Sequence, residues 1–267
     1  MRLKIAHETR YVFQTPVSYA LQQVRLTPKS RQGQTVHDWS ISVQGGREEV
    51  SFVDQFNNQT QLISIDGGAS ELVLRAEGHV ETSNQHGIVG GHGGWTPLWL
   101  YLRKTPLTAP GPGLRKLARS LGEDFRSDVA RLHGLMALIG QEVAYEGGHT
   151  DARTPAEEAI SAGHGVCQDH AHIFIACARL LGYPARYVSG YLMLTDRVQQ
   201  DASHAWAEVY VEGLGWVGFD VSNAISPDER YVAVATGLDY LDAAPVSGLM
   251  FGQASEGLDV SVQVQQQ

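Results

Sequence analysis

Cysteine is scarce in this sequence, which has Cys167 and Cys177 as its two cysteines among 267 residues. If both lie on one helix, a rise of ~1.5 Å per residue separates them by about 15 Å, which is too far for a disulfide. The chain is therefore not a scaffold held together by disulfides. One of the two thiols is free to act as a reagent.

A basic surface and long apolar runs are also missing. The formal net charge is −9 at pH 7, and the nearest basic group, at residues 29–31, is too short to bind nucleic acid. The acidic balance also disfavours binding to anionic membranes. No apolar run is long enough to span a bilayer, and the first residues lack the apolar stretch of a signal peptide. We therefore expect a cytoplasmic protein without a nucleic-acid or membrane partner.

The first third of the chain has the pattern of an all-β region. Short apolar segments alternate with polar residues and are separated by Gly, Pro, Asn and Asp, which predicts an antiparallel sandwich or barrel. Asn57-Asn58 and Gly67-Gly68 are hairpin-type turn signals. The expected strands are Leu3–Ile5, Tyr11–Phe13, Val17–Leu26, Val36–Val43, Glu49–Val53, Gln61–Ile65 and Leu72–Val80.

A glycine- and proline-rich stretch follows and predicts a connection between domains. Five glycines lie between Gly87 and Gly94, and Leu98–Leu102 is a short apolar segment suited to docking. A phosphate-cradling loop is the alternative interpretation, but the stretch has no Walker pattern. We therefore divide the chain into a β-rich domain at residues 1–85, a connection at 86–113, and a catalytic core with C-terminal strands at 114–267.

Helical periodicity begins after the connection. Residues 114–145 carry apolar stripes at helical spacing, with Ser127 as the expected N-cap. Thr154 to Glu157 has the pattern of a capping box with Pro155 at the first helical position, and Gly163 is expected to end that helix.

The segment GHGVCQDHAHIFIACARLLGY, residues 163–183, carries the chemistry. From Cys167 onward it predicts a helix that is apolar almost all round and therefore buried. Cys167 lies at its N-terminus, where unpaired N–H groups and the helix dipole favour a thiolate. Cys177 lies among alanines in the middle of the helix and is expected to be inert.

A cysteine nucleophile needs a base, and the base needs an orienting group. Downstream strands are expected at Ala185–Leu194, His204–Val211 and Trp216–Asp220, with a hairpin turn between the last two. His204 opens one strand and Asp220 closes the next, so an antiparallel pairing places them side by side on one face. The expected roles are nucleophile for Cys167, base for His204 and orienting carboxylate for Asp220.

Metal chemistry has little support in the sequence. There is no HExxH, CxxC or EF-hand-like loop. His170 and His172 are two residues apart and do not share a helix face. We therefore expect no metal and no cofactor.

An ordered set of motifs resembles the bacterial branch of the transglutaminase-like superfamily. The core pieces are GVCQDHAHIF, GYPARYVSGYL, DASHAWAEVYV and GWVGFDVSN, the N-terminal pieces are HETRYVF, VRLTP and DQFNN, and the tail GLDYLDAAPVSG also matches. The resemblance implies an α+β fold in which a β-domain precedes a papain-like core, whose buried nucleophile helix packs on an antiparallel sheet. It also implies a Cys-His-Asp catalytic triad, which falls on Cys167, His204 and Asp220.

Three further residues are weaker site candidates. The Gln168 backbone N–H and Tyr145 are candidates for oxyanion donors beside the Cys167 amide, and Tyr145 is equally well read as a core tyrosine that closes the preceding helix. His170 stands where relatives commonly have an aromatic residue, one turn from the nucleophile, and is a candidate for substrate contact. The chain also departs from the family at Val221-Ser222, where relatives commonly have Pro-Thr.

The triad chemistry passes through an acyl-thioester, and the second nucleophile decides the outcome. Bacterial relatives are often described as predicted cysteine proteases, and we expect a peptidase or amidase acting on a peptide or protein substrate. Acyl transfer from protein glutamine to an amine acceptor is the alternative. Removal of an asparagine-linked glycan is a third enzymatic outcome, and a non-catalytic interaction scaffold is the alternative outside enzymes.

Overall fold

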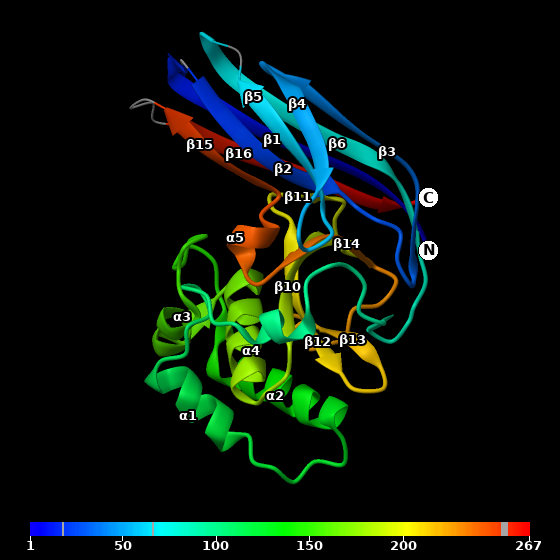
Figure 1. The fold of residues 1–267 in the computed structure, drawn as a ribbon, viewed down its shortest axis with the longest axis vertical. Helices are drawn as coiled ribbons and strands as arrows, with labels where there is room; N and C mark the ends of the chain where they lie inside the picture. Colours follow the sequence, from blue (N-terminus) through cyan, green and yellow to red (C-terminus); the bar gives the residue numbers. More distant parts are fainter. Residues whose placement is uncertain (18, 66, 252–255) are drawn as a thin grey trace.

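The structure, a computed structural model, describes residues 1–267 apart from 18, 66 and 252–255. A β-sandwich occupies one end of the molecule, and a core of helices and a central sheet occupies the other (Figure 1). Both chain termini lie on the sandwich, at the same end. The fold is α+β, as the sequence predicts.

The sandwich consists of two antiparallel sheets. Their inner faces meet in one hydrophobic cluster, which includes Phe13 and Leu72 from one sheet and Val24 and Ile63 from the other. The first sheet has the order β11 (Gln199–Gln200), β16 (Glu256–Gln266), β1 (Arg2–Val17), β6 (Ala69–Thr82) and β3 (Gln34–Gln44). The second has the order β15 (Val246–Phe251), β2 (Tyr19–Thr27), β5 (Gln59–Ile65) and β4 (Gly46–Val53).

The two predicted hairpin turns have different outcomes. Asn57-Asn58 joins β4 and β5, which pair in an antiparallel hairpin, and Asn57 takes a left-handed conformation with φ 66°. Gly67-Gly68 was predicted to be a second hairpin, and that is wrong because β5 and β6 belong to different sheets. The chain crosses the sandwich there. A glycine pair marks a turn, but the packing of apolar faces decides which strands pair.

The C-terminal strands return to the sandwich. β16 pairs with β1 along residues 3–13, and β15 pairs with β2. The predicted division assigned these strands to the catalytic core, whereas their hydrogen bonds are made to the first domain. Pairing partners more than 200 residues apart in sequence leave no local signal, because strand alternation is the same for any partner.

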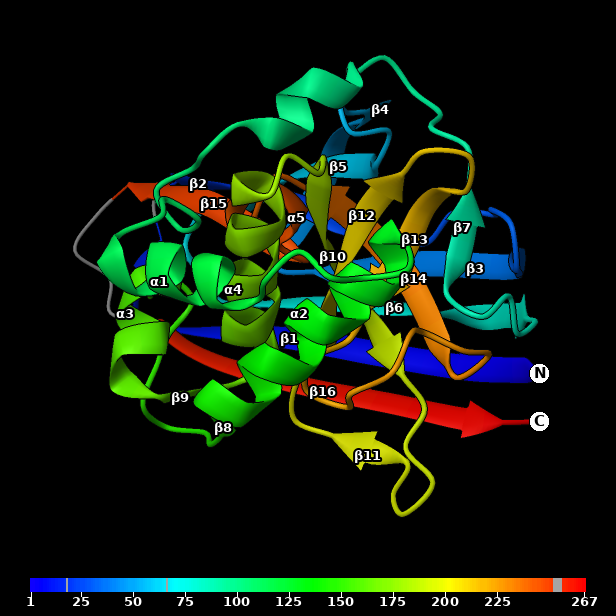
Figure 2. The same cartoon turned by 90° about the horizontal axis from the view of Figure 1, so that it is seen from below.

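The core is built around one buried helix. Figure 2 shows α1, α2 and α3 gathered around α4, with the central sheet behind them. The helices are η1 (Leu98–Leu102), α1 (Pro112–Ser120), α2 (Asp128–Glu142), α3 (Ala156–Ala162), α4 (Cys167–Leu180) and α5 (Tyr240–Ala243). The sheet has the order β14 (Tyr231–Gly237), β10 (Ala185–Leu192), β12 (His204–Val211), β13 (Gly215–Phe219) and β7 (Ile88–Gly90). A short parallel pair, β8 (Ala144–Tyr145) and β9 (His164–Gly165), completes the core.

Two predicted helix caps can be compared with the structure. The Ser127 side chain accepts from the Ala130 N–H and caps α2 as predicted. The predicted capping box at the start of α3 is wrong, because α3 has no side-chain cap. The Glu157 carboxylate instead accepts from three amides at the N-terminus of α1, those of Gly111, Gly113 and Leu114. A negative charge thus stabilises a helix N-terminus, as expected, but the charge comes from α3 and the N-terminus belongs to α1.

The sandwich and the core share a hydrophobic cluster and a buried ion network. Ile5 of β1 packs with Tyr191 of β10 and Val232 of β14 in that cluster. The Glu208 carboxylate of β12 bonds Arg186 within the core sheet and Arg31 from the sandwich side. These contacts fix the sandwich against the core sheet. Residues of the two regions that face each other therefore keep fixed relative positions.

No helix among the described residues is both long and apolar enough to cross a membrane.

Candidate active site

Cys167 is the first residue of α4, as the sequence predicts. The entry to the helix is fixed by Asp169, whose carboxylate accepts from the Val166 N–H and the Thr150 hydroxyl. Gly165 allows this approach, because a Cβ there would lie 2.7 Å from the Asp169 side chain. The thiol is therefore held at a helix N-terminus, where unpaired N–H groups favour an anion.

His204 and Asp220 meet across the β12–β13 hairpin. Ala207 pairs with Phe219, so Asp220 lies on the same face as His204 and Trp206. His204 Nε2 lies 2.7 Å from Asp220 Oδ2 and donates to it, because an ionised carboxylate only accepts. Cys167 lies close enough to His204 to raise the pKa of the imidazole, and Nδ1 is the ring nitrogen that Asp220 leaves available to it. The structure thus connects the three side chains in the order that the sequence predicts.

Asp220 is held by a set of donors. The Tyr231 hydroxyl and Asn223 Nδ2 each donate to Asp220 Oδ2 at 2.7 Å. Burial opposes ionisation of Asp220, but the hydrogen bonds from His204, Asn223 and Tyr231 outweigh it, so its pKa lies below the ordinary value. Asp220 is therefore an anion that orients the His204 ring and favours its protonated form.

The electrostatics of His204 favour an imidazolium. Burial alone lowers its pKa, but hydrogen bonds with Asp220 and Cys167, together with their charges, raise the pKa of His204 to about 10. The Trp206 ring stacks on it at a centroid distance of 6.2 Å and limits its rotation. A protonated imidazole beside the thiol is the partner that an activated cysteine nucleophile requires.

A cavity of about 250 Å³ opens beside the thiol. One wall comes from the core, with Cys167, Gln168, Tyr187 and His204, and the other comes from the sandwich. The sandwich wall includes His7, Thr9 and Tyr11 of β1 and Leu258 and Val260 of β16. The β-domain therefore borders the cleft directly, whereas the sequence leaves open whether this domain recognises substrate, shields the cleft or mediates dimers.

The sandwich wall of the cleft carries no charge at neutral pH. His7 bonds the Tyr191 and Thr9 hydroxyls, and burial lowers the pKa of His7 to about 4. Among the residues that line the cleft, Asp201 is the one carboxylate.

The weaker site candidates are placed differently. Gln168 lines the cleft, with its backbone N–H in the first turn of α4. Tyr145 is 59% exposed, so the reading as a core tyrosine is wrong, and it lies within electrostatic range of Cys167. His170 is buried beneath the site, between Ser222 Oγ and the Val143 carbonyl. Both ring nitrogens of His170 are therefore bonded inside the protein, which leaves neither for a substrate in this conformation.

Cys177 is a buried thiol in the middle of α4. Its side chain is fully buried, its sulfur contacts the Leu114 carbonyl at 3.8 Å, and burial raises the pKa of Cys177 to about 12. Both cysteines are free. The two thiols differ in chemistry because one lies at a helix end beside an imidazole and the other lies in the apolar interior.

Sequence reasoning missed three residues that support the site. Trp206 and Asn223 each stand within three residues of a triad candidate, so their positions on one strand face and in the following turn could have indicated them. Tyr231 had no such signal. It comes from β14 and reaches Asp220 only through the packing of the core sheet.

A cysteine at the start of a helix, a histidine at the start of a strand and an aspartate just after the next strand, on an α+β core, define the class of papain-like cysteine proteins. The model of the transglutaminase-like superfamily matches residues 115–221, and that of the bacterial transglutaminase-like N-terminal region matches residues 3–81. The chain therefore has a transglutaminase-like core and a bacterial transglutaminase N-terminal domain. It joins a core of that superfamily, whose members are generally catalytic cysteine enzymes, to the bacterial N-terminal region.

Similar proteins cover most of the chain. An uncharacterized protein of Mycobacterium leprae is 26% identical over 277 residues, covering 98% of each chain. A crystal structure described as a candidate cysteine protease from Cytophaga hutchinsonii superimposes with a TM-score of 0.77 and 24% identity, covering 100% of this chain and 91% of that one. A protein-glutamine gamma-glutamyltransferase of Pseudomonas aeruginosa is 27% identical over 155 residues, or 50% of this chain and 23% of that protein.

Proposed function

We propose that this protein is a cysteine peptidase or amidase that cleaves amide bonds through an acyl-thioester on Cys167. The observation that carries the proposal is the continuous contact from Cys167 through His204 to Asp220 at the edge of a cleft. The same three side chains, if buried without a cleft beside them, could only stabilise the fold, because no substrate could reach the thiol. A nucleophile that borders a cavity of about 250 Å³ has room for an acyl group.

The chemistry runs in two halves. The Cys167 thiolate attacks the amide carbonyl, and the oxyanion lies against the free N–H groups of Cys167 and Gln168 at the start of α4. The C–N bond breaks as His204 gives its proton to the leaving amine, which departs. Water then attacks the thioester while His204 takes a proton from it. The carboxylic acid leaves, and the Cys167–His204 pair is restored.

Water is the preferred second nucleophile because the cleft offers little to recognise a lysine. Its sandwich wall is apolar or neutral, and Asp201 is the one carboxylate among the residues that line it. A dedicated amine site needs groups that bind the ammonium before it loses its proton. Acyl transfer to an amine is the alternative, and the similarity of half of the chain to a protein-glutamine gamma-glutamyltransferase favours testing it.

The proposal is tested by trapping the acyl-enzyme. N-acetylated peptide amides that differ in their acyl residue are mixed with the protein, and intact-mass spectrometry follows a transient acyl adduct. We expect the adduct on Cys167, with release of the acid and the amine. Cys167→Ala abolishes both, whereas Cys177→Ala, the matched control, leaves them unchanged.

Two outcomes separate the competing functions. If a fluorescent primary amine captures most of the acyl group in place of water, the transferase alternative replaces the hydrolase. If neither peptides, glutamine donors nor glycopeptides acylate Cys167, the scaffold alternative replaces both.

The apolar cleft wall predicts a preference for apolar acyl side chains. Leu258 lines the cleft and is 59% exposed, so Leu258→Glu places a charge on this wall without disturbing the buried core. We expect kcat/KM for peptides with an apolar acyl residue to fall by about tenfold or more. Val12→Glu is the control, because Val12 is on the neighbouring strand, is 49% exposed and does not line the cleft.

The rate of Cys167 alkylation by iodoacetamide is measured for both variants. We expect the alkylation rate to stay at the wild-type value in Leu258→Glu, because iodoacetamide is small and does not need to bind the sandwich wall of the cleft. Equal loss of kcat/KM in the two variants would show that the wall does not select the substrate.

A further inference from the structure

A second cavity lies where the sandwich, the glycine-rich connection and the core sheet meet. Its volume is about 250 Å³, and it shares no lining residue with the cleft at Cys167. Lys29 and Arg31 come from the link between β2 and β3, and Arg186 comes from β10. Gly91 and Gly93 of the connection line it as well. The glycine-rich segment, which has no role in the proposed hydrolase chemistry, thus borders a cavity with three cations.

These cations outnumber the anions beside them. The Arg31 and Arg186 guanidinium groups share a single carboxylate, that of Glu208. The Lys29 ammonium has no ion pair or hydrogen bond among the residues that the structure describes. The local sum is therefore two positive charges.

A nearby carboxylate does not neutralise this excess, because its partners already occupy it. Asp54 forms a buried ion pair with Arg25 at 3.1 Å. It also accepts from the Phe56 and Asn58 amides and from Asn58 Nδ2. Burial and the charge of Arg186 lower the pKa of Lys29 to about 8, while Asp54 and Glu208 oppose the shift. The ammonium therefore remains charged at pH 7, although burial and the neighbouring guanidinium make the charge unfavourable. An anion bound in the cavity would stabilise the charged form of Lys29.

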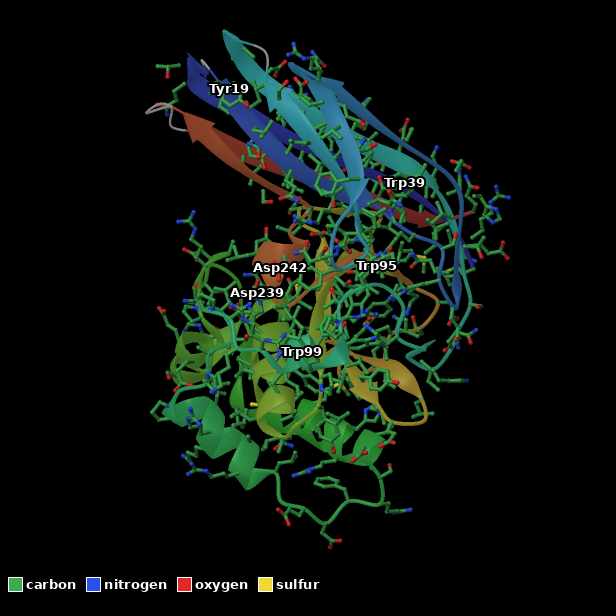
Figure 3. All side chains as sticks on the ribbon, viewed as in Figure 1. Tyr19, Trp39, Trp95, Trp99, Asp239 and Asp242 are labelled. Carbon is green, nitrogen blue, oxygen red and sulfur yellow. The ribbon has the colours of Figure 1, made fainter. Side chains whose placement is uncertain are left out.

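The cavity also has the shape and polar groups to hold an anion. A Cβ added at Gly91 or Gly93 would meet nothing within 4 Å, so this backbone borders open space. The segment is held in place by His92, which accepts from Trp216 Nε1 and donates to the Thr96 carbonyl. Trp95, labelled in Figure 3, follows on the same connection. The side chains of Gln32 and Asn57 complete the polar lining.

We propose that this cavity binds a phosphate dianion, free or as a phosphate ester, between Lys29, Arg31 and Arg186. The charge of a phosphate dianion matches the two uncompensated positive charges, and its oxygens can accept from several donors at once. The site stands apart from Cys167, so it does not depend on the proposed hydrolysis. Bound phosphate joins the sandwich, the connection and the core, and stabilises their assembly by mass action.

Titration calorimetry at constant ionic strength tests the site, with inorganic phosphate and phosphoserine titrated separately. We expect saturable binding of at least one of them to the full chain. Lys29→Met is expected to weaken it by about tenfold or more, since it removes a charge-assisted contact. Lys104→Met removes the same charge at an exposed position outside the cavity and is expected to leave the dissociation constant unchanged. The tighter of the two ligands shows whether the cavity holds the free ion or an ester.

A second variant keeps the test independent of any change at Lys29. Gln32 is exposed, so Gln32→Glu adds a negative charge to the cavity without altering the core, and we expect it to weaken phosphate binding as well. Protein whose Cys167 is blocked with iodoacetamide should bind as tightly as untreated protein. Absence of saturable binding by both ligands, wild-type binding in Lys29→Met and Gln32→Glu, or loss of binding on blocking Cys167 would each overturn the proposal.

Discussion

His204→Ala is expected to slow the alkylation of Cys167 by iodoacetamide by about 100-fold at pH 6. Without the imidazolium, the Cys167 thiolate loses the positive charge that stabilises it, so less of the reactive thiolate is present at pH 6. In the wild-type protein, Asp220 and Cys167 raise the pKa of His204 to about 10, so the imidazolium persists throughout the neutral range. We therefore expect the wild-type protein to react faster than the variant at pH 6, and the difference to shrink as the pH rises toward 9.

Mass spectrometry locates the adduct, and amide turnover gives a second measure. Turnover in His204→Ala is expected to fall on the order of 10⁴-fold, because the base is lost together with the activated thiolate. His37→Ala, on the exposed face of the sandwich, is the control. Cys177 should not react in folded protein, since burial raises its pKa to about 12. A wild-type profile in His204→Ala, or preferential labelling of Cys177, would disprove the activated pair.

Glu208→Gln is expected to lower the free energy of unfolding by about 3–5 kcal/mol. Glu208 is fully buried on β12, and its two oxygens bond Arg31 Nη1 and Arg186 Nε, each at 2.8 Å. Arg186 also lies over the Trp216 ring, 4.1 Å from its centroid. The amide keeps the shape of the side chain but leaves the two guanidinium charges without their anion. Urea unfolding measures the change.

The exposed Glu48 provides a matched control, and pH provides an independent check. Glu48→Gln is expected to change stability by no more than ~0.5 kcal/mol. Burial opposes ionisation of Glu208, but Arg31 and Arg186 outweigh it and lower its pKa to about 2, from 4.5. Its contribution is therefore complete above pH 4.5 and is lost as the pH falls toward 2. The wild-type and Glu208→Gln stabilities should converge over that interval, and a difference below ~1 kcal/mol at pH 7 would contradict the ion network.

The ion network matters to the site because of its place on β12. Glu208 is four residues after His204, and residues at even spacing on a strand share a face. Through Arg31, it ties the strand that carries the base to the sandwich that forms the far wall of the cleft. If Glu208→Gln loosens the contact between the sandwich and the core, kcat/KM for bulky peptides should fall, while the rate of Cys167 alkylation should change less.

Much of the site could be predicted from sequence because its parts are local. Cys167 at the start of α4 follows from the apolar stretch and the glycines before it, and the pairing of His204 with Asp220 follows from a tight hairpin and a period of two. The β-rich first domain follows from alternation alone. These patterns depend on backbone geometry within about 20 residues, which propensity and periodicity describe well.

Other features depended on contacts between distant segments. Glu157 caps α1 rather than α3, β15 and β16 pair with the sandwich, and Tyr231 reaches Asp220 from another strand. His170, although one turn from the nucleophile, lies beneath the site because α4 rotates that face toward Val143 and Ser222. Helical spacing gives the face of a residue but does not say what packs on it.

The sequence by itself therefore determined the α+β class and the three candidate residues of the triad, because each follows from short-range patterns of apolar, turn and reactive residues. Only the tertiary structure decided that the sandwich forms a wall of the cleft and that Lys29, Arg31 and Arg186 surround a second cavity. Both features join segments more than 150 residues apart, and they depend on burial and charge compensation that no local pattern encodes.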